Sequence, residues 1–399
     1  MTYFGYPSKV RQMLKPVKPP ATDASDRRRA AVRVFGALCN GGPATRVGLA
    51  ESLGASASTI TAAVQELRSQ GFVDETGTAA STGGRRATII ELARSLGCVL
   101  AVDVGAINVR IAAANVAGRI FEQRTFPTSS TPDAKRFRHV LVAALDELSR
   151  AAHCPVLAIT LAVPAIVEPE TRQVLLATVA GWPKGDPARW LERFGAPVLV
   201  ENEANLGAVG ECMHGSARGA GDVLFVAIGA GVGAGIVIDG RLYRGATGAA
   251  GEVGFLRRSG SAPPHQLELE AAGPAIVRRY HEAGGGADAQ TAEIVFERAG
   301  LGDAPAQAAV AAAIDELAVG IANAIIVLNP EVVVLGGGLG SAGSALFGPL
   351  RERIRPLVPA MPALVPAELG ADSALVGATV WAAQEAQGRL RATLEVGRG

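Results

Sequence analysis

A glycine-rich stretch, residues 224–254, carries the spacing in this sequence that best suits chemistry with an anion. Two apolar runs typical of β-strands enclose a series of alternating glycines, and the second run reaches a hairpin signal at Asp239-Gly240. The glycines let the backbone approach an anion and point its N–H groups at it. No helix is predicted after them, unlike in a dinucleotide fingerprint. The stretch therefore predicts a strand, a turn and a strand around a phosphate, or a tight hairpin without a ligand.

Carboxylates and amides stand at two further points. Glu252 lies on a turn among small residues, and residues 198–205 run from an apolar strand into a polar segment. Within that segment, Asn202 and Glu203 on their own favour a capped turn before a helix at 206–213. A ligand-binding role for them therefore needs evidence from elsewhere in the chain.

Residues 224–254 resemble the second phosphate motif of the ROK family, named for repressors, open reading frames of unknown function and sugar kinases. The resemblance extends over about residues 28–390. It implies an α/β fold, with an actin-like ATPase (ROK) body of two lobes around a cleft and an N-terminal winged helix-turn-helix domain before it. Many members of the family are sugar-responsive repressors, and others phosphorylate sugars.

The resemblance also implies where a nucleotide would bind. Asp103 and Gly105 match the family's first phosphate motif, Asp-x-Gly-Gly-Thr-Lys. The Thr of that motif is replaced by Ile107 and its Lys by Asn108, so a hydroxyl group and a charge are missing. Ala230 stands where the second motif has another Thr. We therefore predict no kinase activity, no cofactor and only a vestigial nucleotide site. Its residues are Asp103, Gly105, Gly229, Gly231 and Gly337.

The sugar site implied by the resemblance keeps part of its polar set. Glu203 takes the position of the Asp that serves as general base for the sugar hydroxyl in the kinases. Its side chain is one methylene longer, and a displacement of that size can lower the rate by a large factor. Thr178 replaces the sugar-contacting Asn. The residues predicted to bind a sugar or a cationic amino sugar are Asn202, Glu203, Glu252 and Glu268.

We predict no metal site. Ser259, Ser261 and Gln266 stand at the three cysteine positions of the family's zinc motif, and Phe255 replaces its histidine. Zinc prefers thiolate and imidazole ligands in a tetrahedral arrangement. The four cysteines of the chain are scattered without a Cys-x-x-Cys pair, so no disulfide framework is indicated either.

The N-terminal region has the pattern of a winged helix-turn-helix. An apolar face along residues 26–39 predicts a first helix, Thr45 is placed to cap a second, and Ser56 is placed to cap a third. Two apolar runs around a polar tip in residues 72–90 predict a β-hairpin wing. A small helical domain used only for protein contacts is the alternative.

DNA contacts are expected from the third helix and from the wing. Ser and Thr hydroxyls bond phosphates or bases of either type, and arginines of a wing reach phosphate or a minor groove. The family's helix start and wing end are matched by Thr45-Arg46 and Gly84-Arg85-Arg86. The candidate DNA-binding residues are Thr45, Arg46, Ser56, Ser58, Thr59, Thr61, Arg85 and Arg86.

The net charge of +1 hides an asymmetry along the 399 residues. Residues 1–95 hold 13 Lys and Arg against 7 Asp and Glu, a balance of +6, and the remainder holds 25 against 30, a balance of −5. A basic front end on an acidic body suggests nucleic acid at the front. We expect a cytoplasmic protein without a membrane partner, because neither a transmembrane run nor a signal-peptide core is evident. The expected divisions are a mobile arm (1–25), a winged helix-turn-helix domain (26–92), a small lobe (93–210 with helix 378–399) and a large lobe (211–377).

Three functions fit the sequence. The first is a homodimeric or dimer-of-dimers repressor of carbohydrate-related genes, whose partners are a double-stranded DNA operator and a sugar or amino-sugar ligand. The second is an ATP-dependent sugar kinase fused to a DNA-binding domain, against which the missing phosphate-side groups argue. The third is a DNA-binding regulator that needs no ligand, since Thr178 and Phe255 also depart from the family's sugar site.

Overall fold

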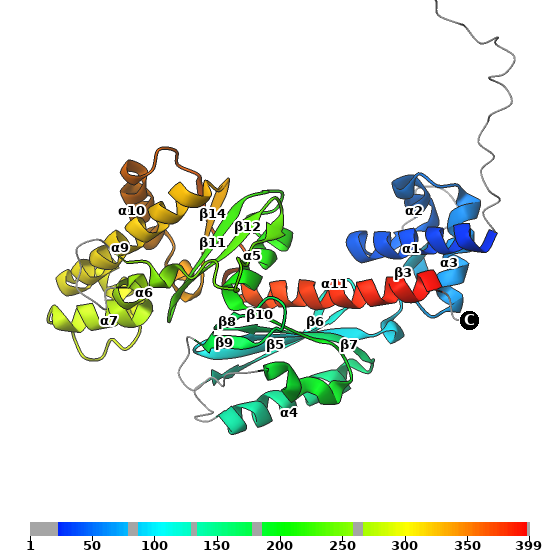
Figure 1. Cartoon of the computed structure of the whole chain (residues 1–399), viewed down its shortest axis with the longest axis horizontal. Coiled ribbons are helices and arrows are strands. Elements are labelled where there is room, and N and C mark those ends of the chain that lie inside the picture. Colours follow the sequence, from blue (N-terminus) through cyan, green and yellow to red (C-terminus); the bar gives the residue numbers. More distant parts are fainter. Residues whose placement is uncertain (1–22, 79–86, 129–133, 178–185, 258–265, 397–399) are drawn as a thin grey trace, which may run out of the picture. The chain divides into compact units, whose positions relative to one another are not determined.

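The computed structural model describes residues 23–78, 87–128, 134–177, 186–257 and 266–396 (Figure 1). The chain forms two compact units. The first comprises residues up to Leu96 together with residues from Gly388 onward, and the second comprises Gly97–Gln387. One helix, α11 (Ser373–Val396), contributes to both units because it passes from the second into the first.

The first unit packs three helices against a three-stranded antiparallel sheet, which is a winged helix-turn-helix. Its elements are α1 (Asp23–Gly41), β1 (Ala44–Thr45), α2 (Arg46–Leu53), α3 (Ala57–Ser69), β2 (Val73–Thr78) and β3 (Thr88–Leu92), with strand order β1-β3-β2. In its core, the rings of Phe35 and Phe72 meet edge-on with centroids 5.6 Å apart. The three predicted helices and the wing hairpin are confirmed, while the wing tip, residues 79–86, lies outside the described residues.

The small lobe of the second unit is built on a five-stranded sheet with the order β10-β7-β4-β5-β6. Its elements are β4 (Cys98–Val104), β5 (Asn108–Asn115), β6 (Ile120–Pro127), α4 (Ala134–Ala152), β7 (Val156–Val163), the hairpin β8 (Ala165–Val167) and β9 (Val174–Ala177), η4 (Pro187–Phe194) and β10 (Val198–Asn202). Strand β4 is buried on both faces, because Leu100 packs with Leu141 of α4 and Ala101 packs with Leu375 of α11. Figure 1 shows α4 and α11 on opposite faces of this sheet. This double burial explains the near-continuous apolar run of β4.

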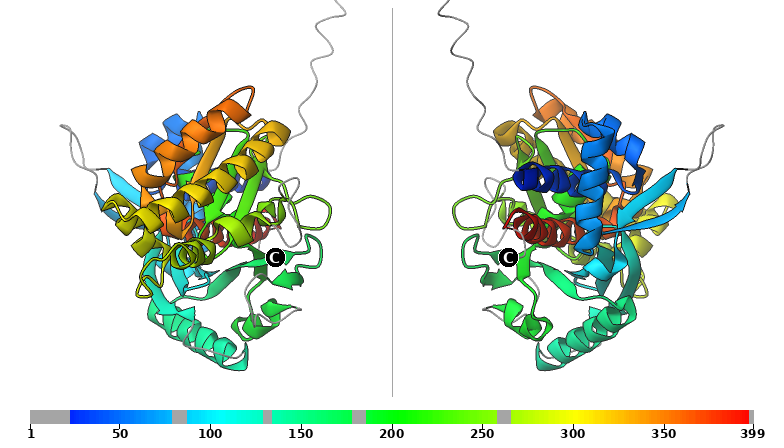
Figure 2. Two further views of the ribbon diagram at one scale, coloured as in Figure 1. Left: turned by 90° about the vertical axis from the view of Figure 1, so that its left-hand side faces the viewer. Right: turned by 90° about the vertical axis from the view of Figure 1, so that its right-hand side faces the viewer.

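The large lobe holds a second five-stranded sheet with the order β13-β12-β11-β14-β15. Its elements are α5 (Glu203–His214), β11 (Val223–Ile228), β12 (Val232–Ile238), β13 (Arg241–Leu242), η5 (Val253–Phe255), α6 (Leu267–Ala271), α7 (Gly273–Glu282), α8 (Ala292–Gly300), α9 (Ala304–Leu328), β14 (Val332–Gly336), η6 (Gly338–Ala342), α10 (Ser344–Ile354) and β15 (Ala363–Pro366). The strand, turn and strand predicted from the glycine-rich stretch are confirmed as β11 and β12, which pair antiparallel. The helices coloured yellow to orange cover one face of this sheet (Figure 2). Together the two lobes form the expected two-lobed α/β body.

Helix α9 is long and strongly apolar. It is the one helix in the described part of the chain with the length and hydropathy of a membrane span, and 56% of its most apolar window is buried. Ile314, Leu317 and Ile321 pack into the large-lobe core. Such burial is typical of the core helix of a globular lobe. The sequence analysis expected no apolar run of membrane length, whereas α9 has that length and hydropathy.

Two glycines let α11 cross α5 closely. A Cβ atom added at Gly377 would lie 1.9 Å from the carbonyl oxygen of Leu206, and one at Gly210 would lie 2.2 Å from that of Ser373. Neither position has room for a side chain. Helix α11 begins before the predicted residue 378, and its last residues belong to the first unit rather than to the small lobe. The lobe boundary expected at residue 210 falls inside α5.

Candidate ligand-binding and DNA-binding sites

The end of β4 places Asp103 opposite Arg110 of β5 in the antiparallel register. The Asp103 side chain is buried, and its Oδ2 atom accepts a hydrogen bond of 3.0 Å from Arg110 Nη1. Burial raises the pKa of Asp103 to about 6, while the Arg110 guanidinium opposes that rise. Asp103 is therefore held inside the protein by Arg110, a partner that the sequence analysis missed. The alternation of residues along the β4–β5 hairpin was the signal that could have identified it.

The loop between β4 and β5 is closed by its own hydrogen bonds. The Gly105 N–H donates to the Asn108 carbonyl at 3.0 Å, and the Thr128 hydroxyl donates to the Gly105 carbonyl at 2.7 Å. Ile107 stands out from this loop with 67% of its side chain exposed. The loop thus presents an apolar side chain where a phosphate-binding loop of the family presents a hydroxyl group.

The glycine turn between β11 and β12 faces a carboxylate. The Gly229 N–H donates to the Gly231 carbonyl at 2.9 Å, so one turn amide is already used. The amide of Val232, the first residue of β12, donates a hydrogen bond to Glu268 Oε2 at 3.0 Å. A Cβ atom at Gly231 would lie only 2.5 Å from that oxygen. The close approach that the glycines allow is therefore made to Glu268 of α6, and a phosphate here would meet a like charge.

Gly337 has a packing reason of its own. Its φ of +78° is left-handed, and a Cβ atom there would lie 2.5 Å from the carbonyl oxygen of Ile228. The end of β14 therefore approaches the end of β11 more closely than any side chain allows. This packing accounts for the glycine without a ligand.

Asn202 and Glu203 lie at the junction of β10 and α5 and take different roles. Asn202 caps the helix: its Oδ1 accepts from the amides of Ala204 at 2.8 Å and Asn205 at 3.2 Å. Its Nδ2 donates to the Ala165 carbonyl at 3.1 Å. The capped turn, which the residues alone favoured, is thus confirmed for Asn202. Glu203 is the first residue of α5.

The Glu203 carboxyl is strongly perturbed by its surroundings. Its pKa is raised to about 8, chiefly by burial and in addition by the nearby Asp103 and Glu252, while Arg110 opposes the rise. Burial and Glu268 likewise raise the pKa of Glu252. We call these four acidic residues, Asp103, Glu203, Glu252 and Glu268, the carboxylate cluster. Three of the four predicted sugar-binding residues thus come together, joined by Asp103, which had been assigned to the nucleotide.

A second group next to the cluster was missed by the sequence analysis. Glu201 is 2% exposed, and its Oε2 accepts from Arg244 Nε at 2.7 Å. The guanidinium of Arg244 lies over the Trp381 ring, 4.8 Å from its centroid, and that of Arg172 lies 5.7 Å from it. We call Glu201, Arg172, Arg244 and Trp381 the arginine bridge. It connects β10, the β8–β9 turn, the segment after β13 and α11. Because these segments are distant in the sequence, local patterns gave no signal of the group.

The predicted DNA-binding hydroxyls are partly used within the first unit. Thr45 Oγ1 accepts from the Gly48 amide at 3.1 Å, and Ser56 Oγ accepts from the Thr59 amide at 3.1 Å, which confirms both helix caps. Thr61 Oγ1 donates back to the Ala57 carbonyl at 2.8 Å. At the start of α3, the exposed side chains are Ser56, Ser58 and Thr59.

Arg46 is paired rather than free. Its Nη2 lies 2.6 Å from Oε1 of Glu75 on β2, and Arg68 reaches the same oxygen at 3.4 Å. Glu75 thus neutralises part of the basic surface predicted to face DNA. Arg85 and Arg86 of the wing lie outside the described residues. So do Thr178, Ser259 and Ser261, and the zinc-motif alignment therefore stays untested.

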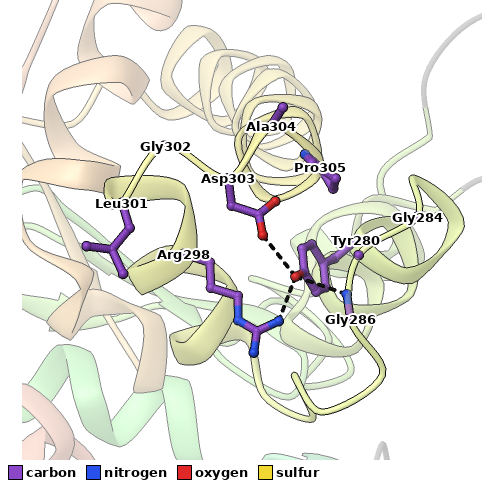
Figure 3. Close-up of a pocket in the computed structure, with 10 residues that line it drawn as sticks. Tyr280, Gly284, Gly286, Arg298, Leu301, Gly302, Asp303, Ala304 and Pro305 are labelled. Carbon is purple, nitrogen blue, oxygen red and sulfur yellow. Dashed lines mark hydrogen bonds between the residues drawn. The ribbon is translucent and has the colours of Figure 1, made fainter.

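A separate pocket of about 580 Å³ lies between the α7–α8 loop and the start of α9 (Figure 3). At its base, the Tyr280 hydroxyl accepts from Arg298 Nη1 at 2.7 Å and from the Gly286 amide at 3.1 Å, and it donates to Asp303 Oδ2 at 3.1 Å. Asp303 also caps α9 through the Ala306 amide. The polar groups at the base of the pocket thus form hydrogen bonds with one another. We infer that this network stabilises the fold rather than binds a ligand.

Comparison with known proteins matches residues 99–385 to the ROK family. The chain is 30% identical over 316 residues to a putative xylose repressor of Caldicellulosiruptor sp. strain Rt8B.4, covering 74% of this chain and 79% of that protein. The structure of a ROK family glucokinase from Streptomyces griseus, in complex with glucose and AMPPNP, has a TM-score of 0.64 at 27% identity, covering 72% of this chain and 100% of that one. A ROK family transcriptional regulator, a homologue of the E. coli MLC protein, shares the fold over 94% of this chain and 100% of its own, with a TM-score of 0.72 at 23% identity.

Proposed function

The chain belongs to the ROK family, and on this basis we propose that it is a DNA-binding transcriptional repressor whose body senses a sugar-type ligand without phosphorylating it. The observation that carries the proposal is the winged helix-turn-helix unit, which precedes a body of the sugar-kinase type. A kinase has no need of the first unit, whereas a repressor needs both. The similarity to a putative xylose repressor supports the same function.

The carboxylate cluster supports the absence of phosphoryl transfer. A general base must be ionised to accept the sugar proton, and a Glu203 carboxyl with a pKa of about 8 is mostly protonated at neutral pH. Asp103 is engaged by Arg110, and Glu268 lies against the glycine turn. The first feature occupies a carboxylate that could otherwise hold a metal ion, and the second sets a carboxylate where a triphosphate would lie.

The same cluster suits a ligand rich in hydroxyl groups. A protonated Glu203 donates one hydrogen bond, and ionised carboxylates accept others or balance the ammonium group of an amino sugar. A phosphorylated sugar would face like charge there. We therefore propose a neutral sugar or an amino sugar as the ligand, bound by Glu203, Glu252 and Glu268.

The DNA side of the proposal rests on α3 and the wing. A winged helix-turn-helix dimer binds an inverted repeat whose half-sites are spaced by whole helical turns. The exposed start of α3, with Ser56, Ser58 and Thr59, is the proposed major-groove contact, and Arg85 and Arg86 are proposed to contact phosphate. A dimer or dimer of dimers in the cytoplasm follows from the same proposal.

Footprinting tests the repressor. We expect a protected inverted repeat in the DNA beside the protein's own gene, and we expect the best ligand from a thermal-shift screen of neutral and amino sugars to weaken that protection. Protection that no sugar changes would support a ligand-independent regulator instead. The absence of any protected sequence would contradict the proposal.

The alternative of an active sugar kinase is favoured by the similarity to a ROK family glucokinase. A coupled assay with ATP and a panel of hexoses separates the two functions. We expect turnover no higher than in a reaction without protein. Steady turnover that disappears in a Glu203→Ala variant but persists in Glu297→Ala, an exposed carboxylate of α8, would establish the kinase.

A further inference from the structure

The small lobe holds a cleft that the proposed function does not use. It lies between α4 and η4 and has a volume of about 650 Å³, within the range of small-molecule pockets. None of its lining residues belongs to the carboxylate cluster or to the arginine bridge. We call it the basic cleft. Its basic and aromatic lining residues are Lys135, Arg138 and His139 of α4 and Arg189, Trp190 and Arg193 of η4.

Positive charge dominates the basic cleft. Among the lining residues, two cations from each helix, Lys135 with Arg138 and Arg189 with Arg193, face one carboxylate, that of Glu192, while two carboxylates outside the lining pair with the arginines of η4. Cations gathered in this way repel one another unless an anion lies among them. A bound anion would remove that repulsion.

The two helices differ in how far their cations are already neutralised. On η4, Arg193 pairs with Asp146 at 3.1 Å and Arg189 with Asp186 at 3.5 Å. On α4, neither Lys135 nor Arg138 takes part in an ion pair or side-chain hydrogen bond with another described residue. The α4 side of the basic cleft is therefore the side on which an anion would find unused charge.

The position of these cations on α4 adds to the potential. Lys135 and Arg138 are three residues apart in the first two turns, so they share a face of the helix with Val142, which also lines the cleft. The N-terminal turn carries the positive end of the helix dipole. Anions are accordingly favoured at the same end of α4 as these two cations, which pair with no other described residue.

An aromatic ring completes the basic cleft. The rings of Trp190 and Phe137 meet edge-on with centroids 6.3 Å apart and an interplanar angle of 65°. Phe137 is buried in the small-lobe core, so this contact fixes how Trp190 stands at the cleft wall. A fixed indole offers a flat apolar surface to a sugar ring or a base.

We propose that the basic cleft binds a small phosphorylated ring compound, a sugar phosphate or a nucleotide. Its phosphoryl group contacts Lys135 and Arg138, and its ring packs on Trp190. The cleft is thus a second ligand site, for anions, on a protein whose carboxylate cluster excludes them. The proposal does not depend on the repressor function, because it uses other residues.

Isothermal titration of the whole protein tests the site with glucose 6-phosphate and with AMP, which represent the two sources of a phosphorylated ring. We expect at least one of them to bind more tightly than inorganic phosphate. The double variant Lys135→Ala/Arg138→Ala should weaken that binding at least tenfold and leave the melting temperature unchanged. Arg136→Ala, on the same helix but outside the lining, is the matched control and should bind like the wild type.

Two further variants separate this site from the carboxylate cluster. Trp190→Phe should weaken the phosphorylated ring compound but not inorganic phosphate, and Glu203→Gln should change neither. Failure of both phosphorylated probes to bind, or equal affinity in the double variant and the wild type, would overturn the proposal. If duplex DNA alone binds more weakly to the double variant, the cleft is a nucleic-acid surface and the proposal is wrong.

Discussion

At the scale of single residues, the protonation of Glu203 decides what the carboxylate cluster can do. The same carboxyl group is a proton acceptor when ionised and a hydrogen-bond donor when protonated. Burial is the main reason that the protonated form is favoured, and the negative charges of Asp103 and Glu252 add to it. On the proposal of a non-catalytic body, we expect the raised pKa of Glu203 to hinder proton acceptance more than its extra methylene does.

This protonation predicts how stability depends on pH. The pKa of Glu203 is about 8 in the folded protein against 4.5 for the ordinary group, so between these values the folded state holds more protons than the unfolded chain. Stability from this group therefore falls as pH rises from about 4.5 to 8, with a slope of at most about 1.4 kcal/mol per pH unit. We expect Glu203→Gln to reduce that fall, as measured by urea unfolding at pH 5.5 and pH 8. Glu297→Gln should leave it unchanged, and an equal fall in all three proteins would contradict the prediction.

Another prediction at this scale concerns Glu75, which holds Arg46 at 2.6 Å and Arg68 at 3.4 Å. Glu75→Gln releases two cations on the surface proposed to face DNA. We expect tighter binding to non-specific duplex and a salt dependence steeper by about one unit of slope per cation that reaches a phosphate. Filter binding at several salt concentrations measures both quantities. Glu51→Gln, exposed on α2, controls for the loss of one negative charge, and an equal effect in that variant would refute the pairing argument.

Sequence could identify the residues of the carboxylate cluster but not their partners. Glu203 and Glu252 were found because the residues around them resemble the family's motifs, although Glu203 replaces an Asp and Phe255 replaces a His. Arg110 and the Glu268 contact with the Val232 amide depend on strand register and on a helix that returns to the glycine turn. The helix cap made by Asn202 could be predicted, because a capping residue is recognised from the few residues around it.

At the scale of elements, the close crossing of α5 and α11 depends on one buried carboxylate. Glu211 of α5 is fully buried, and it accepts hydrogen bonds from the Ser216, Glu368 and Leu369 amides and from the Ser373 hydroxyl at the start of α11. The Glu211 side chain thus positions the turn after α5, the segment after β15 and the first residue of α11. Neither the glycines nor the apolar residues of the crossing specify that alignment.

We therefore predict that Glu211→Ala destabilises the second unit by about 3 kcal/mol or more, since several buried donors lose their acceptor. Chemical unfolding monitored by Trp fluorescence measures the change. Glu352→Ala, an exposed carboxylate of α10, should change stability by less than about 0.5 kcal/mol. A loss below about 1 kcal/mol in Glu211→Ala would show that the donors find other acceptors.

The elements that sequence predicted well are those with a strong local signal. Strands β11 and β12 could be predicted from apolar runs around alternating glycines, and helices α2 and α3 from their N-terminal capping residues. The start of α11 was placed too late, because Ser373 is fixed by Glu211 from another helix. A helix was predicted at residues 311–328, but the earlier start of α9 at Ala304 and its burial were missed, because burial comes from packing and not from composition.

At the scale of the whole molecule, the arginine bridge is the contact best placed to report ligand binding. Glu201 directly precedes the cap of α5, Arg244 comes from the large lobe, and Trp381 belongs to α11. A ligand can shift the lobes only by the difference in its affinity for their two arrangements. If the shift reaches operator binding with a coupling of about 1–3 kcal/mol, each ligand changes the affinity of the other by about 5- to 150-fold.

This predicts that operator DNA lowers sugar affinity by the same factor by which sugar lowers operator affinity. Arg244→Ala should reduce that factor while the operator affinity of the sugar-free protein is kept. Titrations of the sugar with and without operator measure it, and Arg241→Ala, exposed on β13, is the matched control. An undiminished factor in Arg244→Ala would exclude the arginine bridge from the coupling.

Helix α11 also affects how the protein is made. Its last residues complete the core of the winged-helix unit, where Leu394 is 1% exposed and the Arg391 guanidinium lies 3.6 Å from the position of a Cβ atom at Gly36. During translation, the first unit is therefore synthesised early but completed only after residue 396 has left the ribosome. A chain cut short at residue 387 carries α1 to α3 without this packing partner, and we expect it to bind DNA poorly. Unfinished translation products would then not compete with the full-length protein for its operator.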